Sequence, residues 1–242
     1  MKRLLITGGF GKIGKYFTEK YHEKYSIKIA DIKIQENIFP QEVETFETDL
    51  SNSYFDPKIF NNIDVVIHLA GIANPEATFD QVLNANIIAT KNVFETAVTS
   101  GCKKIIFASS AQTIEGYNED VQININMPVR PKNLYGVSKC FGEALGAYYA
   151  FRNRISVICL RIGAYEFPQD FTEMNSRDLS AYLHPDDFNQ LLEKCIEKEN
   201  INFEIFNAIS NNRYKRLDIS ESIQKLKYEP KADSFELFRL KK

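Results

Sequence analysis

The sequence predicts an α/β fold in which a parallel sheet is covered by helices on both faces. Three observations support this prediction. Short apolar segments alternate with helical patterns along most of the chain. A glycine-rich turn, Thr7 to Gly14, directly follows the first apolar segment. The segment 64–71 is apolar almost throughout, as a central strand of a parallel sheet is.

The elements follow from the periodicity of the apolar residues. The expected strands are 2–7, 26–31, 43–50, 64–71, 103–110, 155–162 and 203–209. The expected helices are 12–24, 82–100, 135–152, 186–199 and 218–227, with one more over the last ten residues. The segment 163–184 is expected to be a long loop, and such loops are often functional.

Composition excludes several classes of function. Apolar residues make up 44% and charged residues 26% of the chain, and the net charge is −2, as in an ordinary soluble globular protein. The lysines are scattered, so no nucleic acid or membrane surface is expected as a partner. No apolar segment approaches the ~20 residues that span a bilayer. Four widely spaced cysteines without a Cys/His cluster predict reduced thiols in a cytoplasmic protein and no metal site.

The glycines of the turn, Gly8, Gly11 and Gly14, are spaced three apart. Such a turn lets a diphosphate approach the backbone, where free N–H groups and the helix dipole bind it. Asp31 ends the second strand, where a carboxylate accepts hydrogen bonds from the adenosine ribose and repels a 2′-phosphate. The nearest following cation is Lys33, so NAD is favoured over NADP. A plain strand–turn–helix and a surface aspartate are the alternatives.

Tyr135 and Lys139 begin the helix 135–152 and lie four residues apart, on the same helix face. An ammonium close to a phenol favours the phenolate and lowers the pKa of the tyrosine. A serine at the end of the fifth strand, Ser109 or Ser110, can hydrogen-bond the same substrate oxygen. These groups suit the removal of a proton from an alcohol while hydride leaves its carbon. Alone, the Tyr/Lys pattern is common on solvated helix faces.

These features occur in the order found in short-chain dehydrogenases/reductases: the glycine turn, Asp31, the segment 68–71, the two serines, then Tyr135 and Lys139. The sequence resembles the extended branch of that superfamily, the NAD-dependent epimerase/dehydratase family, over nearly the whole chain. The resemblance implies a Rossmann-type doubly wound sheet. It implies a single NAD-binding domain over 1–242, in which 163–242 adds a small C-terminal extension on the substrate side.

The resemblance also implies roles for individual residues. The implied catalytic residues are Ser110, Tyr135, Lys139 and Asn86, with Ser110 preferred to Ser109. The implied cofactor-binding residues are Gly8, Phe10, Gly11, Lys12, Ile13, Gly14, Asp31, Asp49, Leu50, Leu69, Ala70, Gly71, Asn86, Tyr135, Lys139 and Ile162. The implied substrate-binding residues are Ala73, Ser110, Ala111, Gln112 and Arg177. From the residues alone, Ser110 could be a capping hydroxyl, Asn86 a helix residue with a local backbone bond, and Arg177 an exposed loop arginine.

Four segments, 107–110, 134–143, 160–163 and 186–188, resemble uronate dehydrogenases, which oxidise the anomeric carbon of a hexuronic acid with NAD. Arg177 stands where those enzymes bind the substrate carboxylate. Several hydroxyl-binding positions differ, because this chain has Ala73, Ala111, Gln112 and Ala164 there. We therefore expect the chemistry to persist and the substrate to differ from a plain hexuronate.

The predicted function is NAD-dependent oxidation of a hydroxyl of a small sugar acid or sugar-like substrate. The first alternative is a sugar or nucleotide-sugar epimerase or reductase, since Ala111 is compatible with epimerases. A dehydratase is disfavoured because no acid follows Ser110 closely. The third hypothesis, a non-enzymatic NAD sensor, does not require the intact Ser110, Tyr135 and Lys139 set. The resemblance also implies a homodimer formed through the helices 82–100 and 135–152.

Overall fold

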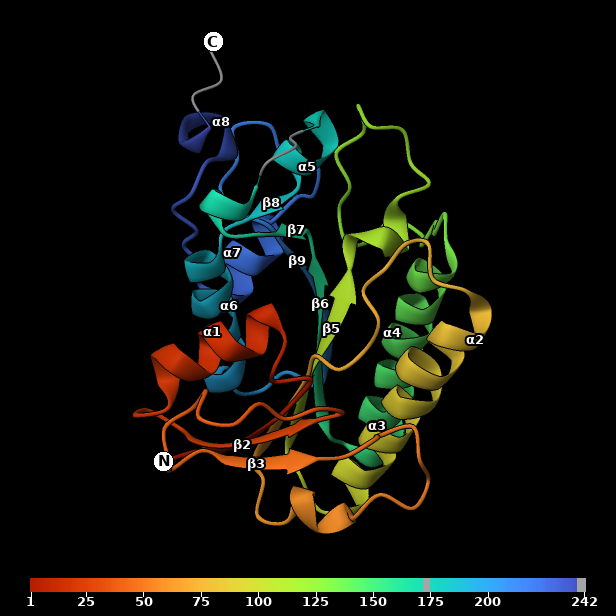
Figure 1. Cartoon of the computed structure of the whole chain (residues 1–242). Helices are drawn as coiled ribbons and strands as arrows, with labels where there is room; N and C mark the ends of the chain where they lie inside the picture. The colour runs from red at the N-terminus through yellow and green to blue at the C-terminus, as the bar shows by residue number, and fades with distance from the viewer. Residues whose placement is uncertain (172–174, 239–242) are drawn as a thin grey trace.

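A seven-stranded parallel sheet forms the centre of the computed structural model, which describes residues 1–171 and 175–238 (Figure 1). The strand order is β3-β2-β1-β4-β5-β6-β9. The strands are β1 (Arg3–Thr7), β2 (Ser26–Asp31), β3 (Glu44–Glu47), β4 (Val65–His68), β5 (Lys104–Ser110), β6 (Ser156–Ile162) and β9 (Phe203–Ala208). The predicted doubly wound sheet and its seven strands are confirmed, although β3 and β4 are shorter than predicted.

Helices cover both faces of this sheet (Figure 1). On one face lie α1 (Lys12–Tyr21), α6 (Pro185–Glu197) and α7 (Ser220–Leu226). On the other face lie α3 (Ala89–Thr99) and α4 (Leu134–Asn153). Each of these helices falls within or close to a predicted one.

Every strand of the sheet except β3 contributes side chains to two hydrophobic clusters because successive residues point to opposite faces. In β1, Leu4 and Ile6 pack in the cluster beneath α1 and α6, whereas Leu5 packs in the cluster beneath α3. All three side chains are almost fully buried. The continuous apolar segments in the sequence are therefore a consequence of coverage on both faces.

The predicted helix 82–100 is longer and less regular than expected. It begins at α2 (Phe79–Val82), continues through a π-helical segment (Leu83–Ile88) and ends with α3. A capping box stabilises its start: the Thr78 hydroxyl accepts from the Gln81 N–H, and the Gln81 side chain accepts from the Thr78 N–H. The wider π turn changes the direction in which the following side chains point.

The predicted loop 163–184 contains regular elements. They are β7 (Ala164–Tyr165), α5 (Ser176–Ser180) and β8 (Tyr182–Leu183), and β7 pairs with β8 in a separate parallel ribbon. Elements this short carry too little periodicity to be recognised in a sequence. The part of the loop prediction at 172–174 lies outside the described residues. The last predicted helix is described in part, as α8 (Ser234–Leu237). Its end, 239–242, also lies outside the described residues.

The glycine turn after β1 is packed against the chain that leaves β4. Gly8 has φ +69°, and its N–H donates to the Ala30 carbonyl at 2.8 Å. A Cβ at Gly8 would lie 2.6 Å from both N and Cα of Ala70, and one at Gly14 would lie 2.5 Å from Cα of Gly9. Gly8 and Gly14 are therefore required by the packing of the chain itself, as well as by any ligand.

Gly8→Ala is expected to lower the free energy of unfolding by about 3 kcal/mol, because it adds a backbone clash to an unfavourable φ. Gly101→Ala is the matched control. Gly101 has a similar φ of +76°, but no heavy atom lies within 4 Å of its added Cβ. That control should lose only about 1 kcal/mol. Urea unfolding followed by circular dichroism measures both, and equal losses would contradict the proposed close packing.

Candidate active site

A cavity of about 870 Å³ opens at the carboxyl ends of the parallel strands. It lies where β1 and β4 are neighbours and the strand order reverses, the usual place for a ligand in such a sheet. Most of the residues predicted for the site line this cavity: Gly8, Phe10, Gly11, Lys12, Ile13, Gly14, Asp31, Asp49, Leu50, Leu69, Ala70, Gly71, Ala73, Ser110, Gln112, Tyr135, Lys139, Ile162 and Arg177.

Asn86 supports the wall of the cavity from behind. Its side-chain amide accepts from the Ile72 N–H at 2.7 Å and donates to the Ile72 carbonyl at 3.1 Å and the Ser138 hydroxyl at 2.9 Å. It is 2% exposed and lies in the π-helical segment. Asn86 therefore connects the loop after β4 to α4, and it does not line the cavity itself.

Ala111 is the other predicted residue that does not line the cavity. It is 1% exposed and packs in a small hydrophobic cluster with Ile114, Ile123 and Leu217. This differs from the prediction that Ala111 contacts substrate. The reason is that 111–114 forms a 3₁₀ turn, which directs Ala111 inward while its neighbour Gln112 lines the cavity.

One end of the cavity is built around Asp31. Its carboxylate accepts from the Phe10 N–H at 2.9 Å and from the Ile32 N–H at 2.8 Å, so it joins the end of β2 to the glycine turn. Further residues line the cavity without a predicted role: Ile32, Gln35, Thr48, Ile72, Pro75, Ala85, Ala89, Ala108, Gly163 and Tyr165. Lys33 and Ser109, both considered from the sequence, line it as well. Most lie in connecting segments or helix turns that carry no motif.

The two serines at the end of β5 have different surroundings. The Ser109 hydroxyl donates to Glu143 at 2.7 Å, and Glu143 forms a buried bidentate ion pair with Arg161 at 2.9 Å for both bonds. The Ser110 hydroxyl accepts from the Gln112 N–H at 3.1 Å and interacts with Tyr135. Ser109 thus belongs to a structural network, and Ser110 faces Tyr135.

Tyr135 and Lys139 are both buried at the start of α4. The Lys139 ammonium lies 5.6 Å from the centre of the Tyr135 ring and 5.0 Å from that of Phe107. Burial raises the pKa of Tyr135, and the interaction with Ser110 opposes this shift. The sequence predicted a lowered tyrosine pKa, but the structure reverses the direction because desolvation is the larger effect.

The Lys139 ammonium is also affected by burial, which lowers its pKa to about 8. It acts in turn on His68, whose pKa is lowered to about 3 by complete burial and by the charge of Lys139. His68 contacts the Thr7 hydroxyl at 2.7 Å and the Thr90 hydroxyl at 3.1 Å. The histidine is therefore neutral at physiological pH and connects β1, β4 and α3.

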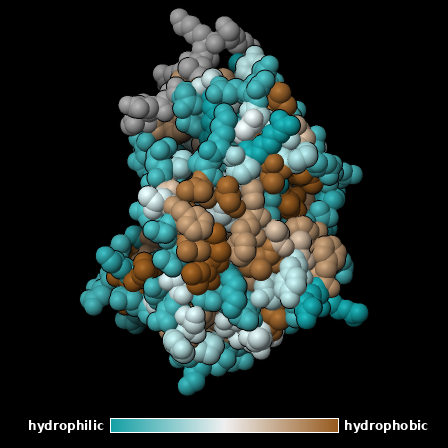
Figure 2. Space-filling model, turned by 90° about the vertical axis from the view of Figure 1, so that its right-hand side faces the viewer, coloured by the Kyte–Doolittle hydropathy of each residue, from teal (hydrophilic) through white to brown (hydrophobic). Residues whose placement is uncertain are grey.

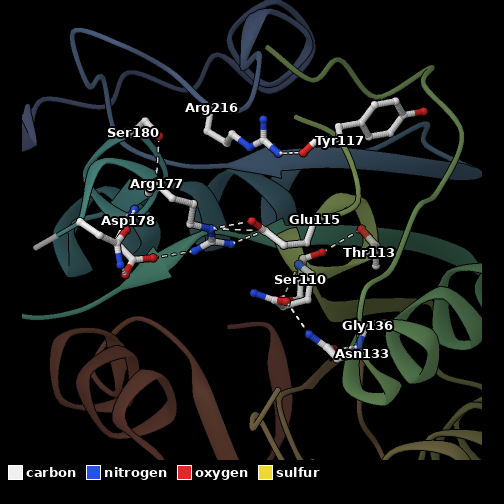
Figure 3. Close-up of polar contacts among 12 residues, drawn as sticks. Ser110, Thr113, Glu115, Tyr117, Asn133, Gly136, Arg177, Asp178, Ser180 and Arg216 are labelled. Atoms are coloured by element: carbon white, nitrogen blue, oxygen red, sulfur yellow. Dashed lines mark hydrogen bonds and ion pairs between the residues drawn. The ribbon is translucent and has the colours of Figure 1, made fainter. Parts of the chain in front are cut away.

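Arg177, from α5, does not project as a free cation (Figure 3). Its Nε donates to both oxygens of Glu115 at 3.1 and 3.2 Å, and its Nη2 donates to Glu115 Oε2 at 2.7 Å. Its Nη1 donates to Asp178 at 2.8 Å. Glu115 was not predicted as the partner of Arg177, because 62 residues separate the two in the chain.

Arg216 anchors the segment that carries Glu115 (Figure 3). It is 2% exposed, and its guanidinium donates to the carbonyls of Tyr117 at 2.8 Å, Val121 at 2.9 Å and Asn118. Ile123 pairs with Leu217 in an isolated parallel bridge. The long polar connection after β5 is thereby held to the C-terminal part of the chain.

Within 1–171 and 175–238, no group of three or more His, Cys, Asp or Glu side chains is placed to hold a metal ion. Over the same ranges, no helix has the length and apolar character needed to cross a bilayer. The four cysteines, Cys102, Cys140, Cys159 and Cys195, are free thiols.

Comparisons with known proteins agree with this geometry. The model of the NAD dependent epimerase/dehydratase family matches residues 4–185. Uronate dehydrogenase of Pseudomonas putida is 34% identical over 238 residues, which cover 98% of this chain and 86% of that protein. L-arabinose 1-dehydrogenase (NAD(P)(+)) of Haloferax volcanii is 28% identical, with 97% of this chain and 98% of that protein covered.

Solved structures are similar over the same length. The crystal structure of uronate dehydrogenase from Agrobacterium tumefaciens matches with a TM-score of 0.90 at 31% identity, and the match covers 99% of this chain and 88% of that one. The extent of the family match, the identity to these relatives and the shared fold lead to one conclusion. This chain belongs to the NAD dependent epimerase/dehydratase family.

Proposed function

We propose that this chain is an NAD-dependent oxidoreductase that oxidises a hydroxyl of a small sugar acid or sugar-like substrate. One observation carries the proposal: Ser110, Tyr135 and Lys139 line the same cavity as the glycine turn and Asp31. Membership of the family supports it, as do the relatives, which are dehydrogenases of a sugar acid and of a neutral sugar.

The residues present fit a dinucleotide. A Cβ at Gly11 would meet only the Gly8 carbonyl, at 3.3 Å, so the glycine turn has no side chain where a diphosphate would lie against the start of α1. The Asp31 carboxylate would accept from the adenosine ribose, which favours NAD over NADP. The chemistry that NAD supplies when bound is the acceptance of a hydride from the carbon that carries the reacting hydroxyl.

The side chains of the cavity supply the proton chemistry. Tyr135, as phenolate, takes the proton of the substrate hydroxyl while the C–H hydride leaves and the carbonyl forms. The Ser110 hydroxyl donates to the same oxygen and orients it. The Lys139 ammonium, 5.6 Å from the centre of the Tyr135 ring, is placed to stabilise the phenolate. Asn86 acts as a positioning residue, because it holds Ile72 and Ser138 on either side of this group.

We also propose that the chain is one domain in which 163–242 completes the substrate side. Arg177 and Tyr165 from this part line the same cavity as the catalytic group, which supports the proposal. A cytoplasmic location is proposed because none of the four cysteines forms a disulfide, as is usual in a reducing compartment.

NADH formation from NAD and a panel of uronates and aldoses tests the proposed reaction. Tyr135→Phe is expected to reduce kcat/KM by about 10²–10⁴-fold, since the base is lost. Calorimetric binding of NAD should persist in this variant. Tyr148→Phe, which removes an exposed hydroxyl from the same helix, is the control and should retain activity. NAD binding without turnover of any sugar would contradict the proposal, and tightly retained nucleotide without net NADH formation would favour the epimerase alternative.

The pH profile follows from the raised pKa of Tyr135. Because only the phenolate accepts a proton and burial raises the pKa of Tyr135, kcat/KM for oxidation is expected to rise with pH and to keep rising above about pH 9. Lys139→Met removes the nearby positive charge, raises the pKa of Tyr135 further and moves the rising limb to higher pH. Lys139→Arg keeps the charge and should leave the limb close to its original position. Identical profiles for the two variants would contradict the assigned role of Lys139.

A homodimer is proposed from the surface of α3 and α4. Figure 2 shows hydrophobic side chains gathered on the side of the molecule that these helices occupy. On α4, Val137, Tyr148 and Phe151 are 46%, 51% and 71% exposed, which is unusual for three large apolar side chains of one helix. A second copy of the chain is the proposed cover, in keeping with the interface that the family resemblance implies.

Light scattering is expected to give about twice the monomer mass of 27.8 kDa. Tyr148→Glu combined with Phe151→Glu places two charges in the proposed interface and should shift the mass to that of the monomer. Tyr214→Glu changes an exposed aromatic residue outside α3 and α4 and should leave the dimer intact. A monomer in the unmodified protein would exclude the proposed interface.

A further inference from the structure

The wall between the main cavity and a neighbouring hollow consists of Gln112 and Arg177, which line both. The second hollow has a volume of about 480 Å³ and contains Glu115 and Asp178 as further lining residues. Arg177 therefore reaches the cavity of the catalytic group with its guanidinium already in contact with two carboxylates. This arrangement bears on which substrates the cavity accepts.

Each basic side chain around the main cavity is paired with a carboxylate, lies beside Tyr135 or lies at the end proposed for the adenosine. Among the described residues that line it, the basic ones are Lys12, Lys33, Lys139 and Arg177. Lys12 pairs with Glu166 at 2.6 Å, Lys33 follows Asp31 at the end proposed for the adenosine, and Lys139 supports Tyr135. Outside the described residues, the sequence at 172–174 contains no lysine or arginine, whereas 239–242 contains Arg239, Lys241 and Lys242.

The ion pair between Arg177 and Glu115 is largely buried. Together with Asp178, these side chains carry excess negative charge. The side chains of Arg177 and Glu115 are 17% and 16% exposed, and Asp178 adds a second carboxylate at 2.8 Å. These three side chains together are net negative. An anionic substrate would be repelled unless it displaced Glu115, and displacement would leave a largely buried carboxylate without its partner.

Glu115 is held in this position by its backbone. The next residue, Gly116, donates to the Arg130 carbonyl at 2.6 Å, and a Cβ there would lie 2.7 Å from that same oxygen. Arg216 binds three carbonyls of the segment that follows. The pair with Arg177 is therefore preorganised, and the free protein already contains the carboxylate that the guanidinium binds.

We propose that Glu115 is a specificity-determining residue that occupies Arg177 and thereby selects an uncharged aldose over a hexuronate. This inference rests on the proposed function, the NAD-dependent oxidation of a sugar hydroxyl. Hydroxyl groups of a neutral sugar can donate to the oxygens of Glu115 or Asp178 without breaking the pair. Among the described lining residues, the cations that are not paired with a carboxylate are Lys33, at the end proposed for the adenosine, and Lys139, beside Tyr135.

The test compares matched sugars that differ in one group: glucose with glucuronate, and galactose with galacturonate. In the unmodified protein, kcat/KM with NAD is expected to be at least about tenfold higher for the aldoses. Glu115→Gln and Glu115→Ala release the guanidinium and should raise the uronate-to-aldose ratio by about tenfold or more. Adding Arg177→Gln to Glu115→Gln should remove this gain. Asp120→Asn, an exposed change in the same segment, is the control and should leave the ratio unchanged.

Calorimetric binding of the same sugars in the presence of NADH provides a second readout that does not depend on turnover. A preference of the unmodified protein for uronates in either readout would overturn the inference. So would an unchanged ratio in both folded Glu115 variants. Absence of turnover for every sugar would contradict the proposed function, and the calorimetric preference would then decide the role of Glu115 on its own. Should the Glu115 variants fail to fold, the preference of the unmodified protein still decides it.

Discussion

The close approach of two backbone segments determines where the cavity forms. Gly8, after β1, lies against Ala70, after β4, with no space for a Cβ between them. This contact brings the glycine turn and the end of β4 together at the point where the strand order reverses. The cavity opens there because the crossovers on either side of β1 and β4 run in opposite directions. The positions of Asp31 and of the catalytic group both depend on this contact.

Several buried polar groups around the cavity hydrogen-bond one another. Asn86 bonds the loop after β4 and the Ser138 hydroxyl, and Glu143 accepts from both Ser109 and Arg161. Burial also shifts the pKa values of the catalytic pair, upward for Tyr135 and downward for Lys139. The shift brings the pKa of Lys139 toward neutral pH and moves that of Tyr135 away from it, so the phenolate depends on the nearby Ser110 hydroxyl and Lys139 ammonium. The surrounding network keeps the pair buried and in place.

Local sequence patterns were sufficient to predict the sheet, most helices and most of the residues that line the cavity. Strand and helix periodicity follows directly from burial on two faces, so it is visible in the sequence. Short elements such as α5 and β7, and the inward turn of Ala111, were not predicted because each spans only one turn or one bridge. The direction of the tyrosine pKa shift was predicted wrongly, because spacing reveals the neighbouring ammonium but not the extent of desolvation.

The sequence by itself determined the fold class, the glycine turn with its acidic partner, and the serine, tyrosine and lysine of the candidate site. Each depends on residues that lie close together in the chain, or on an order of motifs that matches the order in the family. The tertiary structure alone decided that Arg177 is paired with Glu115, 62 residues away, and that Arg216 holds the intervening segment. Such contacts depend on how separate elements pack. Periodicity and spacing along the sequence do not indicate which carboxylate pairs with which guanidinium.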